Sequence, residues 1–365
     1  MDDGGTVVRE EQFAALQRFG LVHPERVRAM INDIIRFYDL NLQGLTVLTE
    51  VGSQYFVVTP IIAALAGAKV YAITRDSQYG KKEDIRRYTK IFAEYCNVKN
   101  PITVLFEKKS DAIHEANIVT NLGFVRPIDA HFIEMMNKNA VVSYMYETWE
   151  RREGDVDLSA CLKKGIPVLG TNESIPGAEV LNFSGHLCAK MLFELDIEIY
   201  RSKIIIVSRD VFGTIIWRFL SALGADAYVV SNLRRVNNRQ YLNDCDAVVI
   251  ADYHAKKPII GENDAQISIR ELQRYSDRVS IVKFVGNVET DALKKNNIPF
   301  VPHQQYGVTM GKTLADLGPK PVINLHAAGL KVGEVMARAR LAGKSMGEVK
   351  SLALASSPAQ DFGDD

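Results

Sequence analysis

The chain has 365 residues, enough for two domains of ordinary size that each bury a core. Lys plus Arg and Asp plus Glu are equal at 44 each, so no net charge attracts nucleic acid or an anionic membrane over a distance. Four widely spaced cysteines argue against a zinc or disulfide framework, and no segment has the pattern of a signal peptide or membrane span. We therefore expect a soluble, cytoplasmic protein without a metal site, whose partners are small molecules or other subunits.

From residue 45 onward, short β-branched runs alternate with helical patterns. Strands that alternate with helices of about a dozen residues indicate parallel pairing through right-handed crossovers. The first series of predicted strands covers residues 45–49, 68–74, 102–106, 116–121, 140–146 and 166–170.

A long segment with helical spacing, residues 178–203, follows this series. The alternation then restarts, and a last helical segment at 322–343 begins after two prolines. The predicted strands of the second series cover residues 203–208, 226–231, 247–251, 279–285 and 298–302.

The pattern predicts an α/β fold with two doubly wound parallel-sheet (Rossmann-like) domains joined by a long helix, with a C-terminal helix crossing back. Residues 1–177, completed by 322–365, are expected to form a flavodoxin-like substrate domain. Residues 178–321 are expected to form a Rossmann-type nucleotide-binding domain, with a substrate cleft between the two.

The segment after the first strand of the second series has the strand, turn, helix and strand order of a dinucleotide-binding unit but lacks two of its three glycines. In GxGxxG the first glycine allows the tight turn, the second lets the backbone approach the pyrophosphate, and the third permits close helix packing. Here Ser208 and Asp210 replace the first two glycines, and only Gly213 is kept. Asp210 either puts a negative charge where the phosphates would sit or turns away to cap the next helix. The predicted cofactor turn comprises Ser208, Arg209, Asp210, Val211, Phe212 and Gly213.

The end of the second strand in this series bears on the choice of cofactor. An acidic residue there normally binds the adenosine ribose, but this chain has Asn232, followed by Arg234 and Arg235. Such a site tolerates a 2′-phosphate, so NADP is slightly favoured over NAD. The alternative is that the two arginines belong to a solvated loop.

Three further segments resemble the S-adenosylhomocysteine hydrolases, relatives of the D-2-hydroxyacid dehydrogenases. NESI at 172–175 resembles their NDSV, residues 248–289 follow their strand, helix, strand and GHFDxE run, and residues 323–336 resemble NLxxAxGHPxxVM. The resemblance implies a nucleotide-type site in the second domain, a homodimer formed through that domain, and a substrate held between the domains.

The residues that would carry out the hydrolase reaction differ from that family. Glu179 and Leu181 stand for its lysine and aspartate, His186 for its cysteine, and Lys331 for the histidine of GHP. The hydrolase reaction itself is therefore not expected, although a polar site has been rebuilt.

Hydride transfer at a carbon bearing a hydroxyl needs a group that exchanges the hydroxyl proton and a donor that polarises the carbonyl. The resemblance places His186, His326 and Lys331 near such a site. His326 is the preferred acid or base because its reference pKa lies near neutrality, the alternative being a helix-start histidine that bonds backbone. Lys331 would pair with an anionic substrate group or be solvated.

Polar residues also follow several strands of the first series, where ligands bind in open α/β sheets. The charged segment 147–157 is interpreted as an exposed connection, with a flap over the site as the alternative. The predicted substrate-binding residues are Glu50, Ser53, Tyr55, Arg75, Asn121, Asn172 and Glu173.

The preferred hypothesis is an NAD(P)-dependent oxidoreductase-like enzyme acting on a hydroxyl or carbonyl of a small polar substrate, a nucleoside or a carboxylated metabolite. The nicotinamide end of the cofactor would lie near Gly286, Asn287 and Asn324. The alternative is a paralogue that has lost dinucleotide binding and serves as a ligand-binding or assembly subunit, or a lyase or hydrolase without redox chemistry.

Overall fold

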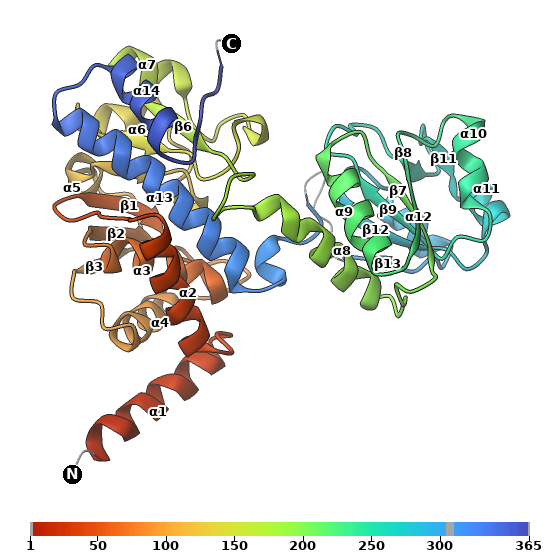
Figure 1. Ribbon diagram of the computed structural model, residues 1–365, viewed down its shortest axis with the longest axis horizontal. Helices are drawn as coiled ribbons and strands as arrows, with labels where there is room; N and C mark the ends of the chain where they lie inside the picture. The colour runs from red at the N-terminus through yellow and green to blue at the C-terminus, as the bar shows by residue number, and fades with distance from the viewer. Residues whose placement is uncertain (1–2, 304–309, 364–365) are drawn as a thin grey trace. The chain divides into compact units, whose positions relative to one another are not determined.

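The computed structural model, which describes residues 3–303 and 310–363, consists of two compact units (Figure 1). Unit 1 is Met1–Val180 with Gly318–Asp365, and unit 2 is Leu181–Leu317. The chain thus enters unit 2 at Leu181 and leaves it at Leu317, where the sequence predicts boundaries at 178 and 321. Within the described residues, no helix combines the length and the apolar character that a bilayer crossing requires.

Unit 1 contains a seven-stranded sheet with the order β14-β6-β5-β4-β1-β2-β3. All neighbouring strands are parallel except β14, which pairs antiparallel with β6. The parallel strands follow the Rossmann order 3-2-1-4-5-6, not the flavodoxin-like order expected for this domain. The strands are β1 (Thr46–Glu50), β2 (Lys69–Ile73), β3 (Ile102–Leu105), β4 (Ile118–Thr120), β5 (Val141–Ser143), β6 (Val168–Thr171) and β14 (Ala359–Gln360).

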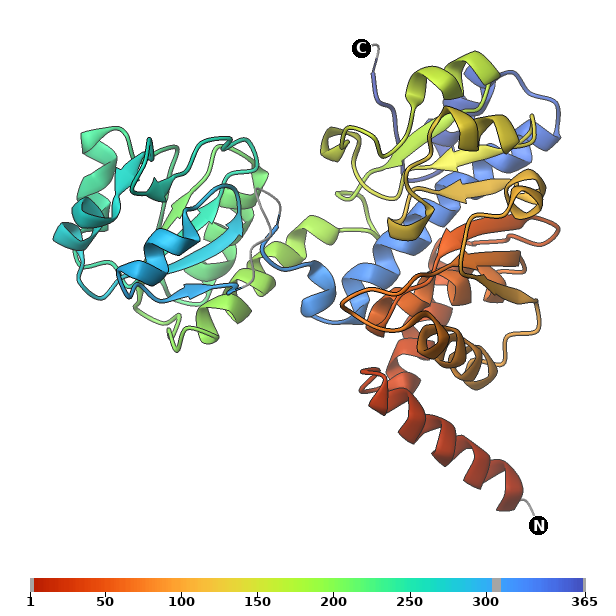
Figure 2. The same ribbon diagram turned by 180° about the vertical axis from the view of Figure 1, so that it is seen from behind.

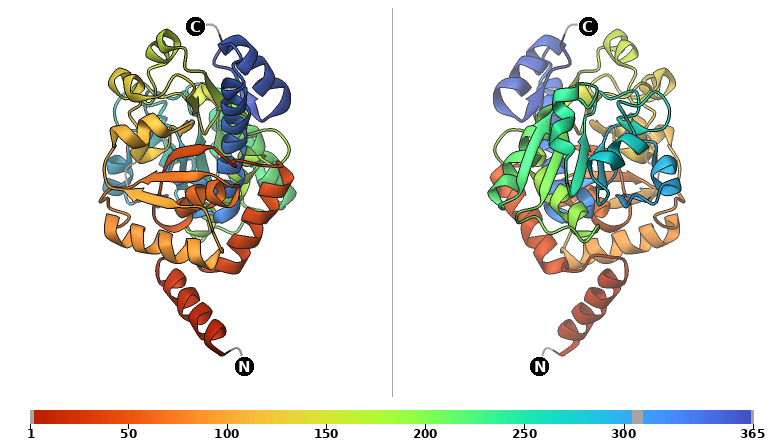
Figure 3. Two further views of the ribbon diagram at one scale, coloured as in Figure 1. Left: turned by 90° about the vertical axis from the view of Figure 1, so that its left-hand side faces the viewer. Right: turned by 90° about the vertical axis from the view of Figure 1, so that its right-hand side faces the viewer.

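Helices cover both faces of this sheet. The C-terminal helix α13 (Pro319–Leu341) packs on β4, β5 and β6 and on α2 (Pro24–Phe37) and α3 (Val58–Leu65), so it crosses back as predicted (Figure 3). The opposite face packs against α5 (Ser110–Glu115), α6 (Ala130–Met135) and α7 (Leu158–Lys164). The remaining helices of unit 1 are α1 (Asp3–Arg18), α4 (Lys82–Tyr95), α14 (Met346–Ser356) and the short η1 (Gln54–Val57), η2 (Gly123–Val125) and η3 (Thr148–Glu150).

Unit 2 contains a five-stranded parallel sheet with the order β13-β12-β9-β7-β8. Counted from β7 the order is 2-1-3-4-5, the other common doubly wound arrangement. The strands are β7 (Lys203–Val207), β8 (Asp226–Val230), β9 (Ala247–Ala251), β12 (Ser280–Val285) and β13 (Phe300–Val301), beside a small pair formed by β10 (Ile260–Gly261) and β11 (Ile267–Ser268).

The strands of unit 2 are apolar on both faces because helices cover both (Figure 2). In β7, Ile204 and Ile206 face α8 (Phe183–Phe193) and α9 (Val211–Ala222), whereas Ile205 and Val207 face the other layer. That layer contains α10 (Val236–Arg239), α11 (Ile269–Tyr275) and α12 (Thr290–Lys295), and the short helices of the unit are η4 (Val180–Asn182), η5 (Gln240–Leu242) and η6 (Leu314–Asp316).

The linking helix is shorter than the sequence predicts. Only Phe183–Phe193 of the segment 178–203 is α-helical, preceded by the 3-10 turn η4. Glu179 and Asp196 have φ values of 44° and 55°, outside the helical region, so the backbone leaves the helix on both sides.

Candidate functional site

The carboxyl edge of the unit 1 sheet holds a buried carboxylate at the point where the strand order reverses. Glu50 ends β1, which lies between β2 and β4, and its side chain is buried. Its Oε2 accepts a hydrogen bond from the Phe124 backbone N–H at 3.0 Å. A Cβ on Gly123 would lie 2.2 Å from the same oxygen, so glycine leaves room for the carboxylate. Burial raises the pKa of Glu50, while the Phe124 N–H and nearby Arg126 partly offset this effect.

Two buried donors lie at the ends of the neighbouring segments. Arg126 Nη1 donates to both carboxylate oxygens of Asp155 at 2.9 and 3.0 Å, and the Oδ1 of Asn121, which follows β4, accepts a hydrogen bond from the Met145 N–H at 2.8 Å. Arg126 Nε and Asn121 Nδ2 are both buried, and neither has a hydrogen-bond partner among the described residues. Because buried polar atoms are normally paired, these two donors are available to an acceptor that the described chain does not supply, either a water molecule or a ligand group.

A cluster of three carboxylates follows β5 and β6. Glu147 Oε2 accepts a hydrogen bond from Trp149 Nε1 at 2.5 Å, and its Oε1 accepts one from the Glu173 backbone N–H at 3.0 Å. Burial and the neighbouring carboxylates raise the pKa of Glu150 to about 7 and that of Glu173 well above its usual value, although Arg152 lowers the former. Within the described residues no group of His, Cys, Asp and Glu side chains is arranged to hold a metal ion. With a pKa of about 7, Glu150 is suited to holding a proton near neutral pH.

The sequence pattern does not reveal the whole of this cluster. The sequence predicts an exposed connection over residues 147–157, and residues 151–154 are exposed, but Glu147 is 6 % and Asp155 8 % exposed. Glu147 comes a few residues after the buried strand β5, at the edge of the sheet where ligands bind in open α/β folds. Glu173 is among the predicted substrate residues, and the fold brings it to Glu147.

The other predicted substrate residues of unit 1 lie in different local settings and do not form a single site. Ser53 precedes η1 without a side-chain cap, Tyr55 is half-buried and Arg75 is exposed. Asn172 uses its Oδ1 to accept the Ser174 N–H at 2.9 Å, so it stabilises its own turn. Of the predicted set, Glu50 and Asn121 come together at the ends of adjacent strands.

The predicted residues on α13 take part in its packing within unit 1. His326 is 4 % exposed and its Nδ1 lies 2.5 Å from the hydroxyl of Thr59, a side-chain partner instead of the backbone considered above. Burial lowers the pKa of His326 to about 4, so the ring is neutral at pH 7. Lys331 Nζ contacts the Asp39 carbonyl at 3.0 Å and Glu334 at 3.1 Å. Asn324 Nδ2 donates to the Ala178 carbonyl at 3.3 Å.

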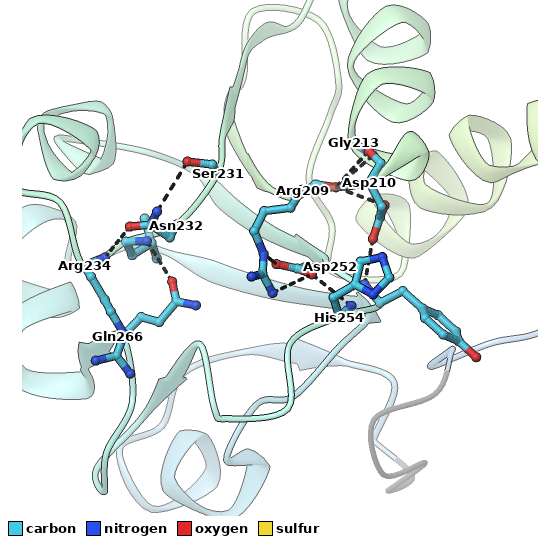
Figure 4. A network of polar contacts seen from close by, with 12 residues as sticks. Arg209, Asp210, Gly213, Ser231, Asn232, Arg234, Asp252, His254 and Gln266 are labelled. Carbon is cyan, nitrogen blue, oxygen red and sulfur yellow. Dashed lines mark hydrogen bonds and ion pairs between the residues drawn. The ribbon is translucent and has the colours of Figure 1, made fainter. Parts of the chain in front are cut away.

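In unit 2 the strand order reverses between β7 and β9, and a polar network fills this switch point (Figure 4). Asp210 caps α9, because its Oδ1 accepts the Phe212 N–H at 3.0 Å, and its Oδ2 accepts the Tyr253 N–H at 2.7 Å. Ser208 Oγ accepts the N–H groups of Asp210 and Gly213, both at 3.2 Å. Asp210 therefore caps α9, and its carboxylate lies at the helix N-terminus, so the two alternatives considered from the sequence do not exclude each other.

Arg209, the cation at this turn, forms an ion pair within the chain. Arg209 Nε lies 2.6 Å and Nη2 3.2 Å from the carboxylate of Asp252, whose side chain is fully buried. Asp252 Oδ1 also accepts the His254 N–H at 3.0 Å. Gly286 has a φ of 115°, and a Cβ there would lie 2.7 Å from the Asp252 carbonyl oxygen, which accounts for the glycine.

These contacts test whether the turn fits the diphosphate of a dinucleotide. Such a group binds to free N–H groups at a helix N-terminus. At α9 the N–H groups of Phe212 and Gly213 are already bonded to side-chain oxygens, and the carboxylate of Asp210 lies among them. The residues present do not fit a diphosphate in this arrangement.

The remaining predicted residues of unit 2 have local partners or surface positions. Asn232 Oδ1 accepts the N–H groups of Arg234 at 3.1 Å and Arg235 at 3.3 Å, so it stabilises the turn after β8. The exposed Arg234 lies 3.9 Å from Asp264. Asn287 Nδ2 donates to the Lys256 carbonyl at 2.9 Å, Val211 is exposed and Phe212 is in the core, and His186 is exposed with its ring 4.2 Å from that of Phe219.

A cavity of about 610 Å³ lies elsewhere in unit 2, near the end of β12. Residues 208–213 are not among its described lining residues, so it is separate from the predicted diphosphate turn. The lining includes Glu262, Lys283, Asn287, Glu289, Asp291 and Lys295.

No protein-family model matches the chain, and no curated protein matches it. Among solved structures it is similar to a dipicolinate synthase chain from Bacillus halodurans, with 12% identity, a TM-score of 0.48, and 82% of this chain and 99% of that chain covered. It is also similar to a putative D-3-phosphoglycerate dehydrogenase from Ralstonia solanacearum, with 12% identity, a TM-score of 0.45, and 87% and 99% covered. A third similar structure is an NAD-dependent formate dehydrogenase from Staphylococcus aureus in complex with NAD, with 12% identity, a TM-score of 0.39, and 74% and 95% covered.

These likenesses concern the fold and carry no argument about substrate or cofactor. They do not show the specific relationship to S-adenosylhomocysteine hydrolases that the sequence motifs suggest, nor a preference for NADP.

Proposed function

We propose that the protein is an enzyme that binds a small hydroxyl- or amine-bearing molecule at the carboxyl edge of the unit 1 sheet and exchanges protons with it. The observation that carries the proposal is the buried carboxylate of Glu50 beside buried donors, Asn121 Nδ2 and Arg126 Nε, that have no partner among the described residues. We call Glu50, Asn121 and Arg126 the polar edge of unit 1.

The chemistry of the polar edge favours one of the substrate classes considered above. A hydroxyl group both donates and accepts hydrogen bonds, so it can donate to Glu50 and accept from Asn121 or Arg126. A nucleoside or another polyol is therefore preferred.

Proton exchange is assigned to carboxyl groups whose burial raises their pKa. A general acid or base works best with a pKa near the working pH, and Glu150, with a pKa of about 7, meets this condition. Glu50 is the group expected to contact the substrate, because it lies at the switch point of the sheet.

A second candidate is an NAD(P)-dependent oxidoreductase that acts on a hydroxyl or carbonyl of the same substrate. The doubly wound sheet of unit 2 and the retained Gly213 favour it. The occupied N–H groups at α9 weigh against it, so it ranks below the first.

The test uses the two tryptophans of the chain, one in each unit. In a Trp217→Phe background, Trp149 beside Glu147 reports on unit 1. Nucleosides, polyols and amines are titrated while its fluorescence and the melting temperature are followed. A compound that binds should lose at least about tenfold in affinity with Glu50→Gln or Asn121→Ala, which is about 1.4 kcal/mol.

The matched control is Glu83→Gln, an exposed carboxylate on α4 in the same unit. It should leave the affinity unchanged. Binding that is equally insensitive to Glu50→Gln and Asn121→Ala would place the ligand elsewhere and reject the polar edge as the site.

A further inference from the structure

We infer that unit 2 carries a closed cradle: side chains of the chain itself occupy the position of a dinucleotide diphosphate, so this turn binds neither NAD nor NADP. The closed cradle is defined as Ser208, Arg209, Asp210 and Asp252 with the α9 N–H groups that they cover. The inference concerns unit 2 alone and does not depend on the site proposed in unit 1.

The hydrogen-bonding groups at the start of α9 are already paired within the chain. Both carboxylate oxygens of Asp210 accept backbone N–H groups, one from Phe212 and one from Tyr253. The Ser208 hydroxyl lies 3.1 Å from Asp210 Oδ1 and accepts the Gly213 N–H. A diphosphate would therefore have to displace contacts that already satisfy the start of α9.

The charges of the closed cradle also disfavour a diphosphate. The closed cradle contains two carboxylates, Asp210 and Asp252, and a single guanidinium, that of Arg209. Arg209 cannot turn toward a phosphate without leaving the fully buried Asp252 unpaired, which is costly. A diphosphate would bring further negative charge to a site whose one cation is already engaged.

The turn also lacks the space that a diphosphate needs. In the GxGxxG motif the second position lacks a side chain so that the pyrophosphate can approach the backbone. Here that position is Asp210, and its carboxylate bridges from α9 to the turn after β9 (Figure 4). Gly213 lets α9 pack closely against Ser208 of the same chain, because a Cβ at this position would lie 2.4 Å from the Cβ of Ser208.

The closed cradle also has a structural role. Asp210 joins the turn after β7 to Tyr253, and Arg209 joins it to Asp252, so two polar links cross the switch point between β7 and β9. Contacts that a nucleotide would make in a dinucleotide-binding domain are made here within the chain.

The experiment titrates NAD, NADP and inorganic pyrophosphate into the full chain. A Trp149→Phe background leaves Trp217, on α9, as the reporter, and calorimetry runs in parallel. The unchanged turn should show no saturable binding at millimolar ligand. Ser208→Gly combined with Asp210→Gly restores two glycines, and affinity for pyrophosphate and for the dinucleotides should then rise at least about tenfold.

Asp157→Gly is the matched control, because Asp157 caps α7 in unit 1 through the Ala160 N–H at 2.9 Å. It removes a helix cap of the same kind without touching the closed cradle, and should bring no gain in binding. Circular dichroism establishes that each variant is folded. If the double variant does not fold, Asp210→Asn takes its place; it keeps an oxygen for the Phe212 N–H and removes the charge, so a smaller gain is expected.

Two results would overturn the inference. One is saturable binding of NAD or NADP to the unchanged turn, reported by Trp217 at submillimolar concentration. The other is a folded variant that binds no better than the unchanged chain, since the side chains of Ser208 and Asp210 would then not be what excludes the diphosphate.

Discussion

The carboxyl edges of the two sheets differ in how their polar groups are satisfied. In unit 1 Glu50 has one backbone donor, and Asn121 Nδ2 and Arg126 Nε have no partner among the described residues. In unit 2 Asp210 and Asp252 each accept at least two hydrogen bonds from the chain itself. Both regions lie at a switch point, so position alone does not distinguish them, whereas the presence of unpartnered buried donors in unit 1 does.

Burial raises the pKa of both Asp210 and Glu50, so the shift does not separate the two regions. What separates them is the number of hydrogen bonds that oppose the shift. The Tyr253 and Phe212 N–H groups and Ser208 oppose it for Asp210. The turn of unit 2 is thus a network of satisfied side chains, whereas the polar edge of unit 1 keeps donors without partners among the described residues.

The largest effect is expected for Gly213→Ala in unit 2. The new Cβ would lie 2.4 Å from Ser208 Cβ and 2.7 Å from its Oγ, and neither is the end of a flexible side chain. Unfolding free energy should fall by about 2 to 3 kcal/mol, measured by urea unfolding with Trp217 fluorescence. Gly347→Ala, with nothing within 4 Å of its Cβ, is the control and should not destabilise the chain. Equal effects would mean that the turn is not closely packed.

A direct comparison sets Asp210→Ala against Glu50→Gln. Asp210→Ala removes a helix cap and leaves the Tyr253 N–H without this acceptor, and should cost about 2 kcal/mol in unfolding free energy. Glu50→Gln removes a buried charge while keeping an oxygen for Phe124, and should cost nothing or stabilise unit 1. Chemical denaturation followed by Trp217 and Trp149 measures each. A comparable loss for Glu50→Gln would mark it as structural.

The carboxylates after β5 and β6 predict a pH dependence. The pKa of Glu150 is about 7 in the folded chain and 4.5 in its ordinary state, so the folded chain holds the proton more tightly. This contribution to stability is complete below pH 4.5 and is lost as the pH rises to about 7. The loss should be on the order of 1 kcal/mol, less than the full shift in pKa would give, because Glu150 is only half-buried and solvent screens its charge, and Glu150→Gln should abolish it.

Denaturation at several pH values checks this difference between the chain and Glu150→Gln. The facing groups Glu147, Glu173 and Arg152 are retained in both proteins. His326 acts with the opposite sign, because a pKa lowered to about 4 destabilises the fold as the pH falls below 6.5, and it cancels in the comparison. Identical pH profiles would show that Glu150 does not titrate as described.

The smallest effect is expected at the turn after β8. Arg234 is exposed, and its ion pair with Asp264 spans 3.9 Å. Arg234→Ala should change the unfolding free energy by less than about 0.5 kcal/mol. Thermal denaturation measures the change, and a larger loss would show that this turn supports unit 2 more than its exposure indicates.

Most of the fold was predictable because it depends on local patterns. The β-branched runs predicted both strand series, and the helical spacing predicted α13, although the helix begins at Pro319 and includes the prolines that were expected to precede it. The strand order could not be predicted from the sequence, since the same alternation of strands and helices is compatible with either 3-2-1-4-5-6 or 2-1-3-4-5. Glu50 and Asn121 could be selected from their places after strands, whereas Glu147 could not be distinguished from its exposed charged neighbours.

By itself, the sequence determined the alternation of strands and helices and the loss of two glycines at residues 208 and 210, because periodicity and glycine positions are local properties of the chain. Only the tertiary structure decided that Asp210 caps α9 and reaches Tyr253, and that His326 is buried against Thr59. The contacts of Asp210 with Tyr253 and of His326 with Thr59 depend on partners that folding brings close from more than forty residues away, and local spacing does not encode such partners.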